Sequence, residues 1–196
     1  MKDYLSLALK NQQRAHEILS GSKIVELWQK NGCTVNLIGS LSMKLLVKHL
    51  DIDLHVYSSG ITEESSFAIV SQLAKDTRVK EIKCINGLHT DEHCIAWHIG
   101  YEDTDGRIWQ IDIIHIEKGT RYDGFFEKMA ERIDKRLTAE QRDTIMRLKY
   151  ETPDGEEIHG VEYYQAVMEA NIRTLPELRT WIATNRNPAG SYWMPE

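Results

Sequence analysis

The chain has 196 residues, of which 41% are hydrophobic and 28% are charged, as expected of an ordinary globular protein with a sizeable core. The formal net charge of −6 argues against a dedicated nucleic-acid binder, which normally presents a basic surface. The three cysteines are widely spaced, and we find neither a signal-peptide pattern nor an apolar run of membrane-spanning length. We therefore expect a cytoplasmic protein with reduced thiols and without membrane contact.

The first 119 residues have the pattern of an α/β (α+β) core with a mixed β-sheet. Segments with helical apolar spacing alternate with short apolar runs bounded by turn residues. In chain order they predict helices over 3–19 and 22–30, a strand over 35–38, a helix over 41–50, a strand over 51–57, a helix over 62–75, and strands over 79–85, 93–101 and 107–116. The turn sequence over 103–106 predicts a hairpin between the last two strands.

From residue 120 onward the pattern is helical. Thr138 and Thr174 each stand three residues before Gln or Glu, which is the spacing of a capping box at a helix start. The predicted helices span 125–136, 138–150, 161–170 and 174–185. We expect a C-terminal helical subdomain over 120–196, beside a core over 1–119.

Three carboxylates occur in strands that are otherwise apolar. Asp51 and Asp53 lie two residues apart, so they share one face of their strand, and Asp112 lies inside a later strand. A charge in apolar surroundings costs several kcal/mol unless a partner compensates it, and a divalent cation with hard oxygen ligands does so. The three residues therefore predict a Mg²⁺ site; the alternative is that they are solvated at strand ends or paired with Lys and Arg.

Gly39 and Ser40 directly precede the predicted helix over 41–50. Glycine permits a close approach of a ligand to the backbone, and the free N–H groups at a helix start favour a phosphate. Ser40 is then a phosphate ligand, or a plain helix cap. Ser42 and Lys44 are further candidates in the first turn, although Lys44 fits a solvated face equally well.

Over about residues 22–116, the sequence resembles the signature of the nucleotidyltransferase superfamily typified by DNA polymerase beta. The resemblance rests on Gly39-Ser40, a following helix, Asp51-x-Asp53 and the later Asp112. The resemblance implies transfer of a nucleoside monophosphate from an NTP, first of all ATP, with release of pyrophosphate. It implies a two-Mg²⁺ site held by Asp51 and Asp53. Asp112 would ligate the catalytic ion and help to deprotonate the acceptor hydroxyl.

In its small size and acidic character, the chain is more similar to the antibiotic-modifying branch, with lincosamide- or aminoglycoside-type substrates, than to a polymerase. We therefore expect a small-molecule hydroxyl or phosphate acceptor rather than nucleic acid, and consider a homodimer. Three alternatives stay open: a toxin–antitoxin-type enzyme acting on tRNA or a partner protein, a non-catalytic nucleotide-binding or regulatory module, and a metal-dependent phosphohydrolase.

Other polar residues near the acids each fit more than one role. His55 shares the face of Asp51 and Asp53 and is either a substrate contact or a hydrogen-bonded bystander. Members of the superfamily often bring a basic residue from the helical part to the triphosphate, and Arg121 is nearest in sequence. His115 lies on the opposite face from Asp112 and is predicted to be a core residue. Tyr163 and Tyr164 fit base stacking or core packing.

Overall fold

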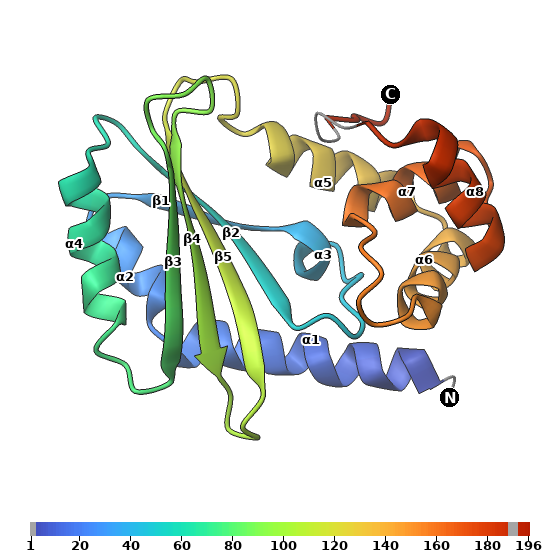
Figure 1. Cartoon of the computed structure of the whole chain (residues 1–196), viewed down its shortest axis with the longest axis horizontal. Coiled ribbons are helices and arrows are strands. Elements are labelled where there is room, and N and C mark those ends of the chain that lie inside the picture. Colours follow the sequence, from blue (N-terminus) through green and yellow to red (C-terminus); the bar gives the residue numbers. More distant parts are fainter. Residues whose placement is uncertain (1–2, 188–191) are drawn as a thin grey trace.

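A five-stranded mixed β-sheet, with the strand order β1-β2-β5-β4-β3, forms the centre of the protein (Figure 1). The computed structural model describes residues 3–187 and 192–196. The strands span Thr34–Ile38 (β1), Asp51–Ser58 (β2), Val79–Gly87 (β3), Cys94–Glu102 (β4) and Ile108–Glu117 (β5). β2 and β5 pair in parallel, whereas the pairs β1–β2, β4–β5 and β3–β4 are antiparallel. The predicted mixed sheet is thus confirmed.

Three helices cover one face of the sheet: α1 (Asp3–Gly21), α2 (Ile24–Lys30) and α4 (Glu63–Leu73). Because side chains alternate along a strand, Ile52, Leu54 and Val56 of β2 all point into this layer, where they are fully buried. The same core contains Trp28 of α2 and Trp109 of β5. The odd-numbered residues of β2, which include the two acids, therefore face away from it.

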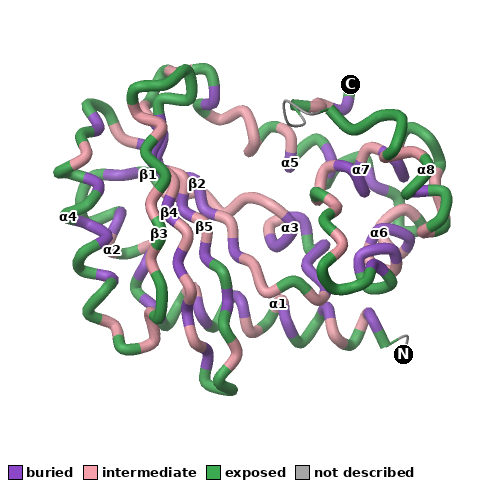
Figure 2. Tube along the Cα trace, viewed as in Figure 1, coloured by how far each residue is buried: buried purple, intermediate pink, exposed green. Residues whose placement is uncertain are grey.

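Four helices lie on the other side of the sheet (Figure 1): α5 (Phe125–Arg136), α6 (Ala139–Glu151), α7 (Gly160–Glu169) and α8 (Leu175–Asn185). The capping boxes predicted at Thr138 and Thr174 are both present. A second apolar cluster joins these helices and is centred on Ile133, Ile145 and Val167. Figure 2 shows the buried residues concentrated in the inner strands and in α6 and α7.

The division into residues 1–119 and 120–196 stays a proposal. Helix α1 contributes Ala15 and Ile18 to the core of the sheet, and it also contacts α6. Met43 and Leu45, from the N-terminal part of the chain, are buried in the cluster of the C-terminal helices. The two parts consequently share packing on both sides of the expected boundary.

The helix predicted over 41–50 is wrong: α3 is a single turn, Gly39–Ser42. The turn ends at Ser42, and Lys44, two residues later, has a left-handed backbone (φ 59°). Three consecutive apolar residues then enter three different clusters: Leu45 packs among the C-terminal helices, Leu46 on the sheet, and Val47 against α1. A left-handed residue does not continue an α-helix, so the helix stops here, and contacts with distant elements override the local helical preference.

Side chains satisfy the backbone of this irregular segment. Asn11 of α1 donates to the Val47 carbonyl at 2.7 Å, and Gln12 donates to the Leu46 carbonyl at 2.9 Å. Lys149 of α6 donates to the Leu45 carbonyl at 3.3 Å. Buried carbonyl groups without such partners would cost free energy comparable to a lost hydrogen bond. The segment over 43–50 is therefore fixed although it is not helical.

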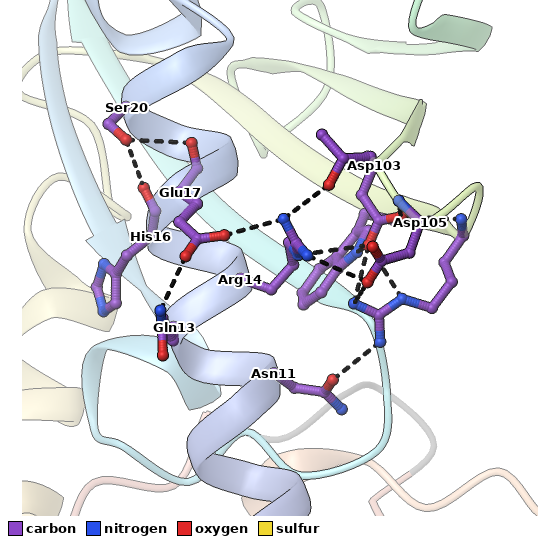
Figure 3. A network of polar contacts seen from close by, with 11 residues as sticks. Asn11, Gln13, Arg14, His16, Glu17, Ser20, Asp103 and Asp105 are labelled. Atoms are coloured by element: carbon purple, nitrogen blue, oxygen red, sulfur yellow. Dashed lines mark hydrogen bonds and ion pairs between the residues drawn. The ribbon is translucent and has the colours of Figure 1, made fainter.

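A polar network joins α1 to the β4–β5 hairpin (Figure 3). The Asp103 side chain is fully buried and accepts hydrogen bonds from the Arg107 guanidinium and from the Trp109 indole at 3.0 Å. Arg14 of α1 reaches toward Asp103 (3.9 Å) and pairs with Asp105 at 3.1 Å. The network anchors the hairpin, and through it the strand that carries Asp112. Among the described residues, the membrane-span criteria of length and apolarity are met by no helix.

Candidate active site

The parallel pairing of β2 and β5 brings the three predicted acids to one face of the sheet. Asp53 lies directly opposite Asp112 in the register, and Asp51 lies opposite Gln110. All three acids line a cleft of about 1110 Å³ between the sheet and the C-terminal helices. The two strands are thus neighbours, and the acids lie on the face away from the helix-covered core.

Gly39 forms a close contact with the second acid. Its backbone has φ +68°, a conformation that L side chains rarely adopt, and a Cβ built at this position would lie 1.9 Å from Oδ2 of Asp53. The β1–β2 register explains the contact, since Ile38, the last residue of β1, pairs with Asp53. The glycine thus makes room for the carboxylate; its closeness to a phosphate stays a prediction.

The carboxylates are held close together with little compensation from the protein. Burial, and then the charges of Asp51 and Asp112, raise the pKa of Asp53 to about 7, against a smaller opposing effect of the Lys149 charge. The Oδ1 atom of Asp51 is buried and has no hydrogen-bond partner among the described residues. Buried acceptors of this kind are rare, and a cation bound between the strands would satisfy them.

Asp112 is held in a different way. His98 Nδ1 lies 2.6 Å from Asp112 Oδ1, and the Gln110 amide donates to both carboxylate oxygens at 3.0 and 2.9 Å. Within residues 3–187 and 192–196, no three His, Cys, Asp or Glu side chains are close enough to form a ready-made metal site. The Asp112 carboxylate is therefore directed toward His98 and Gln110.

The residues present fit a divalent cation of the Mg²⁺ type. The donor atoms are carboxylate oxygens, which Mg²⁺ prefers, and one of them is an orphaned buried atom. The Asp53 carboxylate is accommodated only because residue 39 lacks a side chain. The candidate ligands are Asp51, Asp53 and Asp112; these roles remain proposals.

Lys149 is a basic residue whose charge acts on Asp53 and Asp51, and sequence analysis missed it. It is buried on α6 and lines the cleft, and its Nζ lies 3.0 Å from the Tyr164 hydroxyl. Burial lowers its pKa, but Tyr164 and Asp51 outweigh this, so the net shift is upward and the side chain stays charged. A lysine on the buried stripe of Thr144, Ile145 and Leu148 was the available signal.

The remaining phosphate-binding candidates separate in the structure. Ser40 is buried and lines the cleft. Ser42 does not line it, and its hydroxyl donates to the Gly39 carbonyl at 2.9 Å, which closes the single turn of α3. Lys44 is exposed and also lies outside the cleft lining. Because α3 has only 4 residues, it does not provide the helix dipole that favours a phosphate at a helix start.

Arg121 and His55 also lie away from the cleft. The Arg121 guanidinium stacks over the rings of Tyr122 and Tyr192, at 5.1 and 5.0 Å from their centroids. His55 is buried against Phe126 and lines a separate, smaller cavity. Burial lowers the pKa of His55 to about 4, although Glu127 opposes the shift, so the imidazole is neutral at pH 7. Both residues are close to the acids in sequence, but neither lines the cleft that contains the acids.

His115 is a core residue, as its strand face predicted. It is fully buried on the helix-covered side of the sheet, 2.8 Å from the Ser58 hydroxyl and 3.1 Å from that of Ser66. Tyr163 and Tyr164 are buried between α6 and α7, and they also line the cleft. His98 was missed, although strand alternation places it on the less buried face of β4, opposite Trp97 and Ile99.

The cleft, the sheet order and the acids together define the polymerase beta-like nucleotidyltransferase fold. Solved structures confirm this fold: a Cid1 poly(U) polymerase mutant bound to MgATP superposes with a TM-score of 0.59 at 14% identity, over 81% of this chain and 50% of that one. The non-canonical poly(A) polymerase complex GLD-2–GLD-3 gives 0.58 at 10% identity, over 93% and 61%. A cytoplasmic RNA terminal U-transferase gives 0.54 at 14% identity, over 86% and 53%.

These similarities establish the fold, at sequence identities too low to carry more. The chain spans about half to three fifths of the length of these structures. No family model matches the sequence, and no curated protein matches it either.

Proposed function

We propose that the protein is a Mg²⁺-dependent nucleotidyltransferase. The observation that carries the proposal is the pairing of Asp53 with Asp112 across two parallel strands, with Asp51 beside them on the floor of a large cleft. In the reaction, an acceptor oxygen forms a bond to the α-phosphorus of an NTP. The bond from that phosphorus to the bridging oxygen of the β-phosphate breaks, and pyrophosphate leaves with the electron pair.

The residues have separate roles in this proposal. Asp51 and Asp53 hold Mg²⁺, which supplies charge neutralisation on the transferring phosphoryl group and orients the attacking and leaving oxygens. Asp112 takes the proton of the acceptor hydroxyl, because it is the acid fixed by hydrogen bonds on the open side of the sheet. Lys149 faces the cleft with a positive charge suited to a phosphate.

The charge of the cleft agrees with a metal-bound triphosphate. Five carboxylates and three lysines line it: Asp51, Asp53, Glu81, Asp112 and Asp154 against Lys48, Lys83 and Lys149. Lys48 and Asp154 pair with each other at 2.8 Å. The bare cleft is therefore net negative and attracts cations, and bound Mg²⁺ makes it suitable for an anionic donor such as ATP.

Two classes of acceptor follow from different observations. The acidic cleft and the net charge of −6 favour a small or cationic hydroxyl compound, of which an aminoglycoside is one example. The similar structures are named as poly(U) and poly(A) polymerases and an RNA terminal U-transferase, which favours an RNA 3′ hydroxyl as the second candidate. We place the small-molecule acceptor first, because a basic stripe along the cleft is missing from its lining residues.

The first test is ligand binding, followed by product analysis. Melting temperatures are measured with ATP, GTP, CTP and UTP, each with and without Mg²⁺, because a ligand that binds the native state raises them by mass action. The variants are the double substitution Asp51→Asn/Asp53→Asn and, as a control, Asp91→Asn in an exposed turn. We expect a Mg²⁺-dependent shift with one NTP in the wild type and in Asp91→Asn, and none in the double variant.

Products then separate the remaining alternatives. Pyrophosphate release with a panel of aminoglycosides and lincosamides supports the small-molecule acceptor; release with a short RNA, tRNA or a partner protein supports the others. Free phosphate instead of pyrophosphate identifies a phosphohydrolase. Binding of an NTP without turnover on any acceptor identifies a non-catalytic nucleotide-binding module, and the absence of any Mg²⁺-dependent binding contradicts the proposal.

A further inference from the structure

The face of the sheet that carries the acids continues across β5 onto β4 and β3. The strand register arranges this face in two neighbouring rows that run from β5 to β3: Asp112, His98 and Lys83 in one, and Gln110, Gly100 and Glu81 in the other. Figure 1 shows α6, α7 and α8 well away from β3. We call this part of the cleft the outer floor; it is lined by Glu81, Lys83, His98, Gly100, Ile108 and Gln110.

The opposite side of the cleft is suited to the triphosphate, because Lys149 lies there and its charge acts on Asp51 and Asp53. In an in-line displacement the attacking and leaving oxygens lie on opposite sides of the transferred phosphorus. Since pyrophosphate leaves toward Lys149 in the proposed reaction, the acceptor oxygen approaches from the side of Asp112. The rest of the acceptor then extends over the outer floor.

The middle of the outer floor is bare backbone between two side chains of different character. A Cβ built on Gly100 would lie 3.3 Å from Cβ of Glu81 and 3.6 Å from Cγ2 of Ile108, so these two residues flank the glycine. Ile108 is 52% exposed and offers an apolar contact. A ring compound can therefore lie on Gly100 with one edge against Ile108 and the other against the Glu81 carboxylate.

The charges of the outer floor are free to meet a ligand. Glu81 and Lys83 are both exposed, and within the described part of the chain neither side chain takes part in an ion pair or a hydrogen bond. Glu81 lies beside the bare Gly100, whereas Lys83 lies beside the His98 ring. A cation near Glu81 also gains from the negative field of the cleft, while an anion meets Lys83 against that field.

We propose that the outer floor binds the acceptor, with an ammonium group of the acceptor paired to Glu81 while its hydroxyl group lies at Asp112. The inference rests on the proposed nucleotidyl transfer and names the chemistry of its acceptor, an amino alcohol. Because adjacent strands are about 4.8 Å apart, β3 lies about 10 Å from β5, a separation that a compound of two sugar-sized rings spans. Glu81 is thus a specificity-determining residue.

The test uses neamine, which has two rings that carry amino and hydroxyl groups, and its tetra-N-acetyl derivative, which has the same rings without positive charge. Both are titrated into the full-length protein at pH 7 and low salt, without nucleotide. Calorimetry gives Kd, and the backbone ¹⁵N–¹H shifts locate the site. We expect saturable binding of neamine with shifts at Gly100 and Gln110, and much weaker binding of the acetylated compound.

Two charge variants with opposite expected effects test the pairing. Glu81→Gln should weaken neamine binding about two- to fivefold, as for an exposed ion pair, and Lys83→Gln should strengthen it. Glu64→Gln at the start of α4 and Lys75→Gln just after α4 make the same changes in net charge at exposed positions and should have no effect. Non-saturable binding, equal binding of the acetylated compound, or an unchanged Kd in Glu81→Gln would overturn the proposal.

A short oligouridylate distinguishes the RNA acceptor. RNA on the outer floor would bind more weakly in Lys83→Gln and more tightly in Glu81→Gln, and this pattern would overturn the amino alcohol in favour of RNA. Mg²⁺-dependent NTP binding is measured on the same samples. Its absence would remove the enzyme and with it the acceptor role, whereas NTP binding together with neamine binding that ignores Glu81 would overturn this inference alone.

Discussion

The carboxylate of Asp53 rests against the α-carbon of Gly39: any side chain at position 39 would begin 1.9 Å from Oδ2. This contact connects the turn after β1 to the floor of the cleft. The Asp53 carboxylate can occupy its position only if residue 39 has no side chain. A pair of glycine variants can test this dependence.

Gly39→Ala should displace Asp53 as well as strain the backbone. Gly32 offers a matched control, because it has φ +79° but a Cβ added there would meet no other part of the described chain within 4 Å. Both substitutions carry the left-handed backbone penalty of about 1–2 kcal/mol. Only Gly39→Ala should also abolish Mg²⁺-dependent NTP binding. Urea unfolding and the thermal shift with ATP check the two effects; equal behaviour of both variants would contradict the role of the contact.

Asp53→Asn should stabilise the metal-free protein. Since the pKa of Asp53 is raised to about 7, its ionisation on the folded chain is unfavourable, and the amide relieves the repulsion from Asp51 and Asp112. The expected gain at pH 8 is on the order of 1–3 kcal/mol in urea unfolding without Mg²⁺. Asp91→Asn serves as the control and should change little.

The same group predicts a pH dependence of the metal-free protein. A carboxyl group with a raised pKa contributes stability below its unfolded pKa of about 3.9, and this contribution is lost as the pH rises through about 7. The wild type should therefore lose stability relative to Asp53→Asn between about pH 4 and 7. Added Mg²⁺ should restore stability above pH 7 in the wild type alone. Parallel pH profiles of the two proteins would exclude the shift.

His98 should position Asp112 for the proposed reaction. Replacing His98 with Phe removes the partner 2.6 Å from Asp112 Oδ1 and leaves the Gln110 amide. By analogy with partners that orient metal ligands, kcat should fall about 10- to 100-fold. KM for the NTP should change little, since His98 contacts the acid on the acceptor side. His98→Asn, which can still donate, should recover part of kcat; an effect confined to KM would argue for substrate binding instead.

Asp103→Ala should be strongly destabilising. Burial alone would raise the pKa of Asp103, but the N–H groups of Arg107, Trp109 and Asp105 outweigh it and hold the pKa at about 2. Removing this acceptor takes away the partner of the Trp109 indole and the main partner of the Arg107 guanidinium, at a cost of about 2–4 kcal/mol in urea unfolding. Asp105→Ala, on the exposed part of the same network (Figure 3), should cost much less.

The depressed pKa of Asp103 also fixes the direction of its pH effect. The stabilisation is present above the unfolded pKa of about 3.9 and is lost as the pH falls toward 2. Acid unfolding should accordingly begin at higher pH in Asp103→Asn than in the wild type at the same temperature. An unchanged acid midpoint would show that the network contributes nothing to folding.

Local sequence signals predicted the structure correctly where neighbouring residues determine it. The capping boxes at Thr138 and Thr174 begin α6 and α8, and the alternation around Asp51 and Asp53 identified the polar face of β2. The prediction over 41–50 was wrong because Lys44 has a left-handed backbone, and Leu45, Leu46 and Val47 then pack against elements that are distant in sequence.

The surroundings of the acids were only partly predictable for the same reason. Arg121 follows Asp112 closely in sequence, yet it stacks on Tyr122 and Tyr192 outside the cleft. Lys149, much further along the chain, reaches the cleft because α6 packs beneath Leu45. The sign of the charge and the distance in sequence do not tell which basic residue reaches the cleft. The packing of the C-terminal helices determines it.

The parallel β2–β5 ladder has a consequence for how the site comes into being. Asp53 and Asp112 are adjacent in that ladder, but α4, β3 and β4 lie between them in the chain. Pairing strands this far apart requires closing a long loop, which is a slow, non-local event in folding. A nascent chain that ends before β5 contains Asp51 and Asp53 without their third member. The carboxylate cluster thus forms late, and its appearance would report that the sheet is complete.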